Sequence, residues 1–391
     1  MKQVFQFFIF SIMLLWINTA CGSDKSIIVA AEQPNEYLHL LVGKKVGLMV
    51  NHTSMVDSVH LLDFLLSQGV MVDKVFAVEH GFRGDAADGE LIDHSIDHTT
   101  GIPIVSLYGS EKKANKNQMQ GLDIVIFDMQ DVGCRFYTYI SSMHYMMEAC
   151  AENDISFFVF DRPNPNGDYI AGPVLDMELK SFVGMHPIPI VHGCTVGELA
   201  QMINGENWLN DGIQCDLKVF KVKNYTHSCL YKLPINPSPN LPNHLSVRLY
   251  PSLCFFEATN VSIGRGTKFP FQVIGYPGSP VKEISFTPKS IPGMSNNPLH
   301  ENILCHGIDL KDLNEVPPFT LEFFIRFFNY FENHDDFWKR RRWIDLLSGD
   351  KNFYQQINSG IDAQSIKAAW ENGIQKYKHT RKKYLLYPDF E

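Results

Sequence analysis

VDKVFAVEHGFRGD (residues 72–85) joins a largely apolar run to a cluster of charged side chains. Val72–Val78 has the composition of a buried strand, and core strands do not normally end in charged residues. The cluster that follows this strand consists of Glu79, His80, Arg83 and Asp85, spaced by two glycines. Polar groups gathered where a strand stops are typical of an active site in an α/β fold.

Apolar runs of strand length alternate with helical patterns from about residue 40 onward. The predicted strands are Lys45–Val50, Val72–Val78, Ile102–Leu107, Leu122–Phe127, Ser156–Phe160 and Asp216–Val222. The predicted helices are Val59–Gly69, Tyr139–Asn153 and a helix from the N-cap Thr195, with Glu198 in the capping-box position, to about Leu209. Short apolar strands separated by helices indicate a parallel sheet covered on both faces. The expected fold class is therefore α/β, with a Rossmann-like, doubly wound parallel sheet.

The pattern changes after the Pro-rich stretch Leu233–Pro242, which has the composition of a boundary or a crossing loop. Beyond it, Leu245–Thr259 is mixed and aromatic, and helices are predicted at Phe319–Asn333 and Gln364–Tyr384. We expect a Rossmann-like catalytic domain at residues 26–230 and a smaller α+β domain at residues 231–391.

Residues 1–20 have the pattern of a signal peptide, because Lys2 precedes an apolar stretch too short to span a membrane comfortably. Small residues stand directly before Cys21, as in a bacterial lipobox. We therefore expect an exported, periplasmic lipoprotein that is attached to the membrane through a lipid anchor on Cys21.

The overall charge argues against nucleic acid as a partner. The formal net charge is -9, and the longest basic run is Lys339-Arg340-Arg341-Arg342, which we interpret as the solvated face of a helix. Sites for nucleotides are not expected either, since the chain has no G-x-G-x-x-G after its first strand and no P-loop. An α/β-hydrolase nucleophile is not expected, since there is no G-x-S-x-G elbow.

The cysteines show neither C-x-x-C pairs nor zinc spacing. Cys194–Cys215 and Cys229–Cys254 are candidate disulfide bridges, although most of the cysteines are expected to be small buried hydrophobes. His94 and His98 are four residues apart, but their surroundings favour a polar loop over a metal-binding helix. No metal and no cofactor are expected.

Three further predicted strands end in polar residues, and the second half of the chain adds more candidates. In open parallel sheets, ligands bind beyond the carboxyl ends of the strands, so we expect these side chains to line one cleft. The candidate binding residues after the strands are Asn51, Asp128, Gln130, Asp131, Arg135, Tyr137, Tyr139, Asp161, Arg162 and Asn164. The candidates from later in the chain are His192, Asn240, Glu257, Asn260 and Arg265.

Acids, arginines, tyrosines and asparagines in one cleft suit a carbohydrate. Glycoside hydrolysis needs one carboxylic acid to protonate the leaving oxygen and a second carboxylate as base or nucleophile. Glu79 is the leading acid, since it leaves a buried strand and its pKa can be raised there. Asp128, Asp131 and Glu257 compete for the second role, whereas Asp161 and Asp128 could instead cap loops or pair with arginines.

Two alternatives stay open on these residues. Asp128, Asp131 and Asp161 could hold Mg²⁺ for phosphoryl hydrolysis. The protein could also be a non-catalytic, sugar-binding lipoprotein. Sensitivity to a chelator would identify the first, and ligand affinity unchanged by Glu79→Gln the second.

Four long motifs resemble the exo-β-N-acetylmuramidase family (NamZ, or YbbC-like). They are residues 79–84 (EHGFRG), 128–139 (DMQDVGCRFYTY), 161–165 (DRPNP) and 257–267 (EATNVSIGRGT). The sequence departs from the family at Val78, where Pro is usual, and at Cys134, where a small hydroxyl residue is commoner. The resemblance covers the chain from about residue 40 to its end and implies a Rossmann-like domain, a smaller C-terminal domain and an active cleft between them.

The activity that the resemblance implies is release of N-acetylmuramic acid from the non-reducing end of peptidoglycan fragments such as MurNAc-GlcNAc. It carries a catalytic role over to Glu79 only. Muramic acid differs from glucosamine by a lactyl ether with a carboxylate, and an arginine fork suits that group. We therefore expect Arg83, Arg135 or Arg265 to confer preference for muramic acid.

Overall fold

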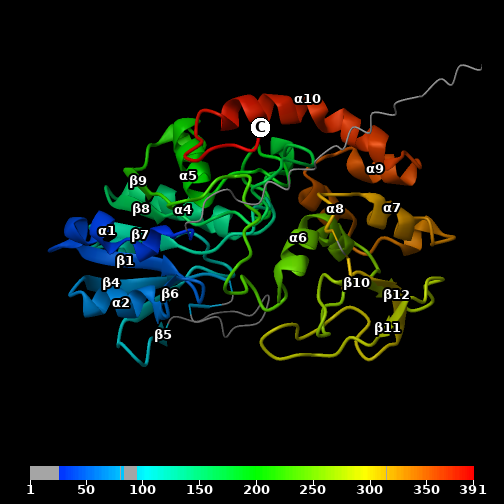
Figure 1. The fold of residues 1–391 in the computed structure, drawn as a ribbon, viewed down its shortest axis with the longest axis horizontal. Coiled ribbons are helices and arrows are strands. Elements are labelled where there is room, and N and C mark those ends of the chain that lie inside the picture. Colours follow the sequence, from blue (N-terminus) through cyan, green and yellow to red (C-terminus); the bar gives the residue numbers. More distant parts are fainter. Residues whose placement is uncertain (1–25, 80, 83–94, 314) are drawn as a thin grey trace, which may run out of the picture.

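The computed structural model describes residues 26–79, 81–82, 95–313 and 315–391. The predicted signal peptide, Cys21, His80, Arg83, Asp85 and His94 lie outside the described residues. Two parts lie side by side, a large sheet with helices on its faces and a smaller part that contains most of the second half of the chain (Figure 1).

The first part is built on a seven-stranded sheet. Its strands, in spatial order, are β5 (Ser95–Ile96), β6 (Pro103–Ser106), β4 (Met71–Ala77), β1 (Lys45–Val50), β7 (Ile124–Asp128), β8 (Ser156–Phe160) and β9 (Leu217–Phe220). All neighbouring pairs are parallel except β5–β6. The expected doubly wound parallel sheet is confirmed, and strands occupy the predicted positions to within one or two residues.

Helices cover both faces of this sheet because successive residues of a strand point to opposite sides. In β7, Ile124 and Ile126 pack in one apolar cluster with α1 (Pro34–Leu41) and α2 (Leu61–Ser67). Val125 and Phe127 pack in the other cluster with α4 (Tyr139–Glu152) and α5 (Val196–Gly205). Shorter elements here include β2 (Met55–Val56), β3 (Val59–His60) and α3 (Lys116–Met119), together with the 3-10 helices η1 (Ala30–Glu32), η2 (Met177–Leu179) and η3 (Asn210–Gly212).

The predicted capping box of α5 is present. The Thr195 hydroxyl accepts from the amide of Glu198 at 3.3 Å, and the Glu198 carboxylate accepts from the amide of Thr195 at 2.9 Å. The helix ends at Gly205 rather than near Leu209, because Asn207 adopts a left-handed backbone with φ 56°. Such a conformation cannot continue a right-handed helix.

The second part combines a small antiparallel sheet with helices. The sheet has the order β10 (Val273–Tyr276), β12 (Cys305–Asp309) and β11 (Ile284–Phe286). The helices are α6 (His244–Leu253), α7 (Glu322–Phe328), α8 (Arg341–Ser348), α9 (Phe353–Asn358) and α10 (Ala363–Arg381). The expected helix at Phe319–Asn333 is thus shorter than predicted. The aromatic segment after α6 continues as a 3-10 helix, η4 (Cys254–Ala258).

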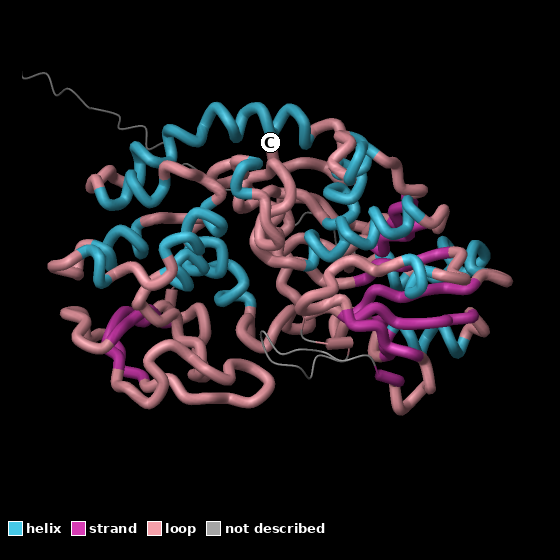
Figure 2. Tube along the Cα trace, turned by 180° about the vertical axis from the view of Figure 1, so that it is seen from behind, coloured by secondary structure: helices cyan, strands magenta, loops and turns pink. Residues whose placement is uncertain are grey.

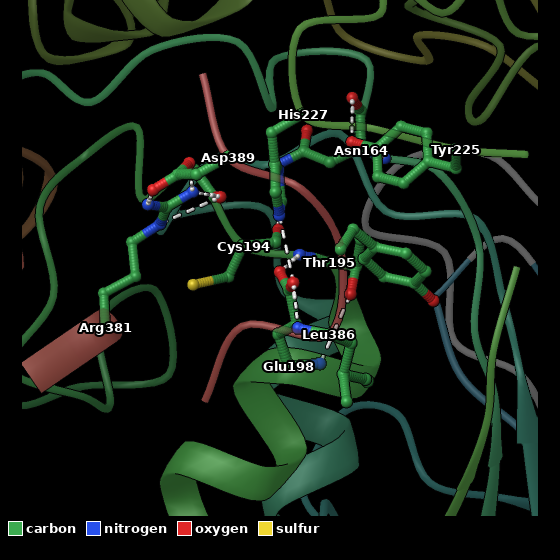
Figure 3. Close-up of polar contacts among 12 residues, drawn as sticks. Asn164, Cys194, Thr195, Glu198, Tyr225, His227, Arg381, Leu386 and Asp389 are labelled. Carbon is green, nitrogen blue, oxygen red and sulfur yellow. Dashed lines mark hydrogen bonds and ion pairs between the residues drawn. The ribbon is translucent and has the colours of Figure 1, made fainter. Parts of the chain in front are cut away.

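The C-terminal segment ties the two parts together. Helix α10 passes over both parts, and the chain after it turns back onto the first part near α5 (Figures 1 and 2). The buried Glu198 accepts from the amide of Leu386 at 2.8 Å and contacts His227 at 3.0 Å. Arg381 donates to the carbonyl of Gly193 and pairs with Asp389 (Figure 3). The last residues therefore pack on the half in which the chain begins.

The two candidate disulfide bridges are absent. Cys194, Cys215 and Cys254 are buried free thiols, so neither the Cys194–Cys215 nor the Cys229–Cys254 bridge is present. Cys194 instead lies with its Sγ 3.3 Å from the Tyr377 hydroxyl of α10. In the part of the chain that the structure describes, none of the helices combines the length and the apolar character that a membrane crossing requires.

Candidate active site

Glu79 stands just beyond the carboxyl end of β4, where two neighbouring loops hold its carboxylate. The Tyr108 hydroxyl donates to Glu79 Oε1 at 2.9 Å, and the Thr138 hydroxyl donates to Oε2 at 3.1 Å. Tyr108 follows β6 and Thr138 precedes α4, so three segments from the same edge of the sheet meet at this half-buried acid. Sequence reasoning missed Tyr108, although its place directly after a predicted strand was a usable signal.

Glu79 lines a cavity of about 60 Å³ between the two parts of the molecule. Three predicted residues, Tyr137, Asn240 and Arg265, line it as well. Asn240 lies in the Pro-rich loop, and its Nδ2 donates to the carbonyl of Met294 at 2.7 Å. The other lining residues are Phe136, Thr138, Ser238, Leu241, Tyr250 and Phe271. The structure therefore brings Glu79 together with three candidates from loops far apart in the sequence.

A larger cavity of about 520 Å³ lies in the second part and has Arg265 in common with the first. Glu257, from η4, lines this larger cavity, and its Oε1 accepts from Arg265 Nη2 at 2.7 Å. Arg265 is held by a tight turn, since Gly264 has φ +82° and a Cβ there would lie 2.5 Å from the carbonyl oxygen of Phe269. Arg265 thus stands between two cavities, each of which contains one glutamate.

Asp128 and Asp161 have structural roles, because other groups of the protein already donate hydrogen bonds to their carboxylates. Both carboxylate oxygens of Asp128 accept from Arg162, at 2.6 and 2.9 Å, and Asp128 is fully buried. Asp161 accepts from the Thr195 hydroxyl at 2.7 Å and from the Gly197 amide at 2.8 Å, at the N-terminus of α5. Neither they nor Arg162 line the two cavities that meet at Arg265.

The three aspartates of the phosphohydrolase hypothesis therefore do not converge on a common ion. Among residues 26–79, 81–82, 95–313 and 315–391, no group of three or more His, Cys, Asp or Glu is arranged to hold a metal.

Arg135 does not line the cavities either. Its guanidinium is fully buried and donates to the carbonyls of Pro173 and Ile188 in the first part, at 2.7 and 2.9 Å. It also donates to Leu347 and Ser348, the last carbonyls of α8, at 3.1 and 2.6 Å. Cations are favourable at the end of a helix, where carbonyls lack partners. Arg135 therefore links the end of α8 to loops of the first part, which corrects the expectation that it binds a substrate carboxylate.

Asp131 is a buried carboxylate with one unpaired oxygen. Its Oδ1 accepts from the amide of Gly133 at 2.7 Å, whereas Oδ2 has no hydrogen-bond partner among the described residues. Burial raises the pKa of Asp131 from 3.8 to about 7. The residue lies beside Asn164 and Arg162 in a separate, very small cavity, so it does not share the wall that contains Glu79.

The other candidates lie outside the walls of the two joined cavities. They are Asn51, Gln130, Tyr139, Asn164, His192 and Asn260. Most of their polar side-chain atoms form hydrogen bonds with backbone groups. Gln130 donates to two carbonyls, and Asn164 donates to the carbonyl of Cys194. Tyr139 packs edge-on against Tyr137 with ring centroids 4.9 Å apart. These residues shape the loops that carry the cavity walls.

Both the sequence and the fold of this chain are similar to those of known proteins. Residues 46–245 match the family model described as exo-beta-N-acetylmuramidase NamZ, N-terminal, and residues 248–387 match the corresponding C-terminal model. The chain belongs to the NamZ family. It is 37% identical over 419 residues to the peptidoglycan beta-N-acetylmuramidase NamZ of Bacillus subtilis, covering 99% of this chain and all of that one.

Two solved structures of DUF1343 family proteins from Bacteroides fragilis are similar as well. The first is 46% identical with a TM-score of 0.87, covering 93% of this chain and 100% of that one. The second is 28% identical with a TM-score of 0.80, covering 92% and 99%. The mostly parallel sheet with its second, smaller part is therefore shared across these relatives.

Proposed function

We propose that this NamZ family member is an exo-acting glycosidase that releases N-acetylmuramic acid from the non-reducing end of peptidoglycan fragments. The observation that carries the proposal is the position of Glu79, an oriented carboxyl group in a cavity between the two parts of the molecule. Membership in the family and the activity named for the Bacillus subtilis relative support it.

Glu79 is the general acid in this proposal. Two hydroxyls donate to its carboxylate and hold it at the end of β4, so its orientation does not depend on the substrate. Protonation of the glycosidic oxygen by a positioned acid contributes about 10²–10⁴-fold to the rate. Glu257 is the better placed second carboxylate, because it shares Arg265 with the Glu79 cavity, whereas Asp131 lies in a separate cavity.

The test compares two substrates in wild type and Glu79→Gln. An aryl β-N-acetylmuramide has a leaving group that departs without much protonation, whereas the disaccharide MurNAc-GlcNAc needs the acid. We expect Glu79→Gln to lose about 10²–10⁴-fold in kcat on the disaccharide and clearly less on the aryl substrate. An aryl β-N-acetylglucosaminide should be a poor substrate for both proteins.

Two further variants distinguish between Glu257 and Asp131 as the second catalytic carboxylate. Glu257→Gln should abolish turnover of both muramides, whereas Asp131→Asn should retain it. Full activity in Glu79→Gln on the disaccharide would overturn the assignment of the acid. Failure of wild type to cleave either muramide would overturn the proposed function itself.

We also propose that the protein is exported and anchored to the membrane through Cys21. The support is the apolar stretch after Lys2 and the small residues before Cys21. Wild type should fractionate with membranes, and Cys21→Ser should release it into the soluble exported fraction. Equal fractionation of the two proteins would rule out the lipid anchor.

A further inference from the structure

The basic run at residues 339–342 is divided between two environments. Arg341 begins α8, pairs with Asp345 at 2.5 Å and lies 3.5 Å from the centroid of the Tyr354 ring. Lys339 and Arg340 precede the helix and line the 520 Å³ cavity together with Arg265. The interpretation of this run as one solvated helix face is therefore right for only part of it.

The backbone that carries Lys339 and Arg340 is fixed against the cavity wall. Both of their amides donate to the carbonyl of Ala258 at 3.0 Å, and Ala258 directly follows Glu257. The Arg340 guanidinium lies 4.4 Å from the centroid of the Trp343 ring, a cation–π distance. The two cations are thus held at the rim of the cavity, while their exposed side chains remain able to reach a ligand.

The charges of this cavity do not balance. Its wall contains Arg265, Lys339 and Arg340, but among the described residues that line it Glu257 is the only carboxylate, and Glu257 is already paired with Arg265. Across the described ranges, neither Lys339 nor Arg340 forms an ion pair with an acid. A concentration of positive charge in a protein with a net charge of -9 favours an anionic ligand.

We propose that Lys339 and Arg340 bind the lactyl carboxylate of muramic acid and so determine the preference for this sugar over N-acetylglucosamine. The inference rests on the proposed function, because it names the part of the substrate that the larger cavity receives. A cavity of about 520 Å³ has room for a sugar substituent and not only for a carboxylate, since ligand sites commonly enclose about 300–1,000 Å³. Among the arginines expected for this role, Arg83 lies outside the described residues, Arg135 is occupied by carbonyls and Arg265 is paired with Glu257.

The experiment compares an aryl β-N-acetylmuramide with its lactyl methyl ester, which has the same shape but no charge. Lys339→Gln and Arg340→Gln should each raise KM for the acid about tenfold, the usual worth of one charged hydrogen bond, with kcat little changed. Neither variant should change KM for the ester. Arg342→Gln is the matched control, because Arg342 is exposed in the same basic run but does not line the cavity.

A binding measurement removes any dependence on turnover. Calorimetry with Glu79→Gln should detect binding of free N-acetylmuramic acid that weakens steeply as NaCl is raised, because salt screens exposed charges. Adding Lys339→Gln and Arg340→Gln should weaken this binding and flatten its dependence on salt. Binding of N-acetylglucosamine should be unaffected by both substitutions.

The outcomes separate the inference from the proposed function. If wild type cleaves neither the acid nor the ester, the proposed function fails. If wild type prefers the acid and the double variant Lys339→Gln/Arg340→Gln keeps that preference, the function stands and the inference is overturned. A third substrate, with the lactyl group joined to L-alanine, moves the carboxylate outward. If only this substrate responds to the two substitutions, the cavity binds a peptide carboxylate and the lactyl assignment is wrong.

Discussion

Replacement of Arg135 by methionine should destabilise the fold without removing a substrate contact. Four buried carbonyls accept from its guanidinium, two in the first part and two at the end of α8. Leaving a buried acceptor without its donor costs about 1–3 kcal/mol. Methionine fills much of the same volume, so the loss of packing is small.

Removal of the charge offsets part of this loss. Burial lowers the pKa of Arg135 from 12.5 to about 10, which corresponds to about 3 kcal/mol of desolvation that the variant no longer bears. With about 2 kcal/mol for each of the four carbonyls and this offset subtracted, the free energy of unfolding should fall by about 5 kcal/mol. Arg135→Lys should be intermediate, because a single ammonium cannot reach all four carbonyls.

Urea unfolding and steady-state kinetics on the same preparations test this reasoning. At a temperature where Arg135→Met is folded, KM for the aryl muramide and for its methyl ester should change by the same factor. A free energy of unfolding close to that of wild type, together with a KM that rises for the acid alone, would refute the structural role. Arg135 would then be a substrate contact, as the sequence pattern first indicated.

Three further predictions concern buried groups near the same loops. Burial raises the pKa of Asp131 from 3.8 to about 7, so ionisation disfavours the folded state and stability falls as pH rises from about 4 to 7. Asp131→Asn should flatten that fall in the Tm, and an unchanged slope would contradict the burial argument. Burial lowers the pKa of His192 from 6.5 to about 3, so the stability present above pH 6.5 is lost as pH falls toward 3, by about 1.4 kcal/mol for each pH unit. His192→Gln should make the acid side of the Tm profile shallower; if it is as steep as in wild type, other groups govern acid unfolding. A Cβ at Gly349, where φ is +67°, would lie 2.5 Å from Arg135 Nη2, whereas one at Gly360, where φ is +70°, would meet no atom within 4 Å. Gly349→Ala should therefore lose more free energy of unfolding in urea than Gly360→Ala, and equal losses would argue against the contact with Arg135.

The sequence by itself determined the parallel sheet and the position of its leading acid. Strands such as Leu122–Phe127 are nearly all apolar because helices cover both faces, and that composition is visible without coordinates. The capping box at Thr195 could also be predicted from the sequence, because it depends on residues three positions apart. Glu79 could be singled out because a local rule places ligand groups where parallel strands end.

Only the tertiary structure decided what each polar side chain does there. Asp128 and Glu79 both follow buried strands, but Arg162 neutralises the first and a cavity opens beside the second. The partners come from distant loops, so no spacing in the chain predicts them. The sequence pattern indicated that Lys339 and Arg340 belong to a solvated helix face, whereas the structure places them in the wall of the same cavity as Arg265. Long-range packing settles whether a charge is paired, buried or open to a ligand, and packing of this kind leaves no periodic mark in the sequence.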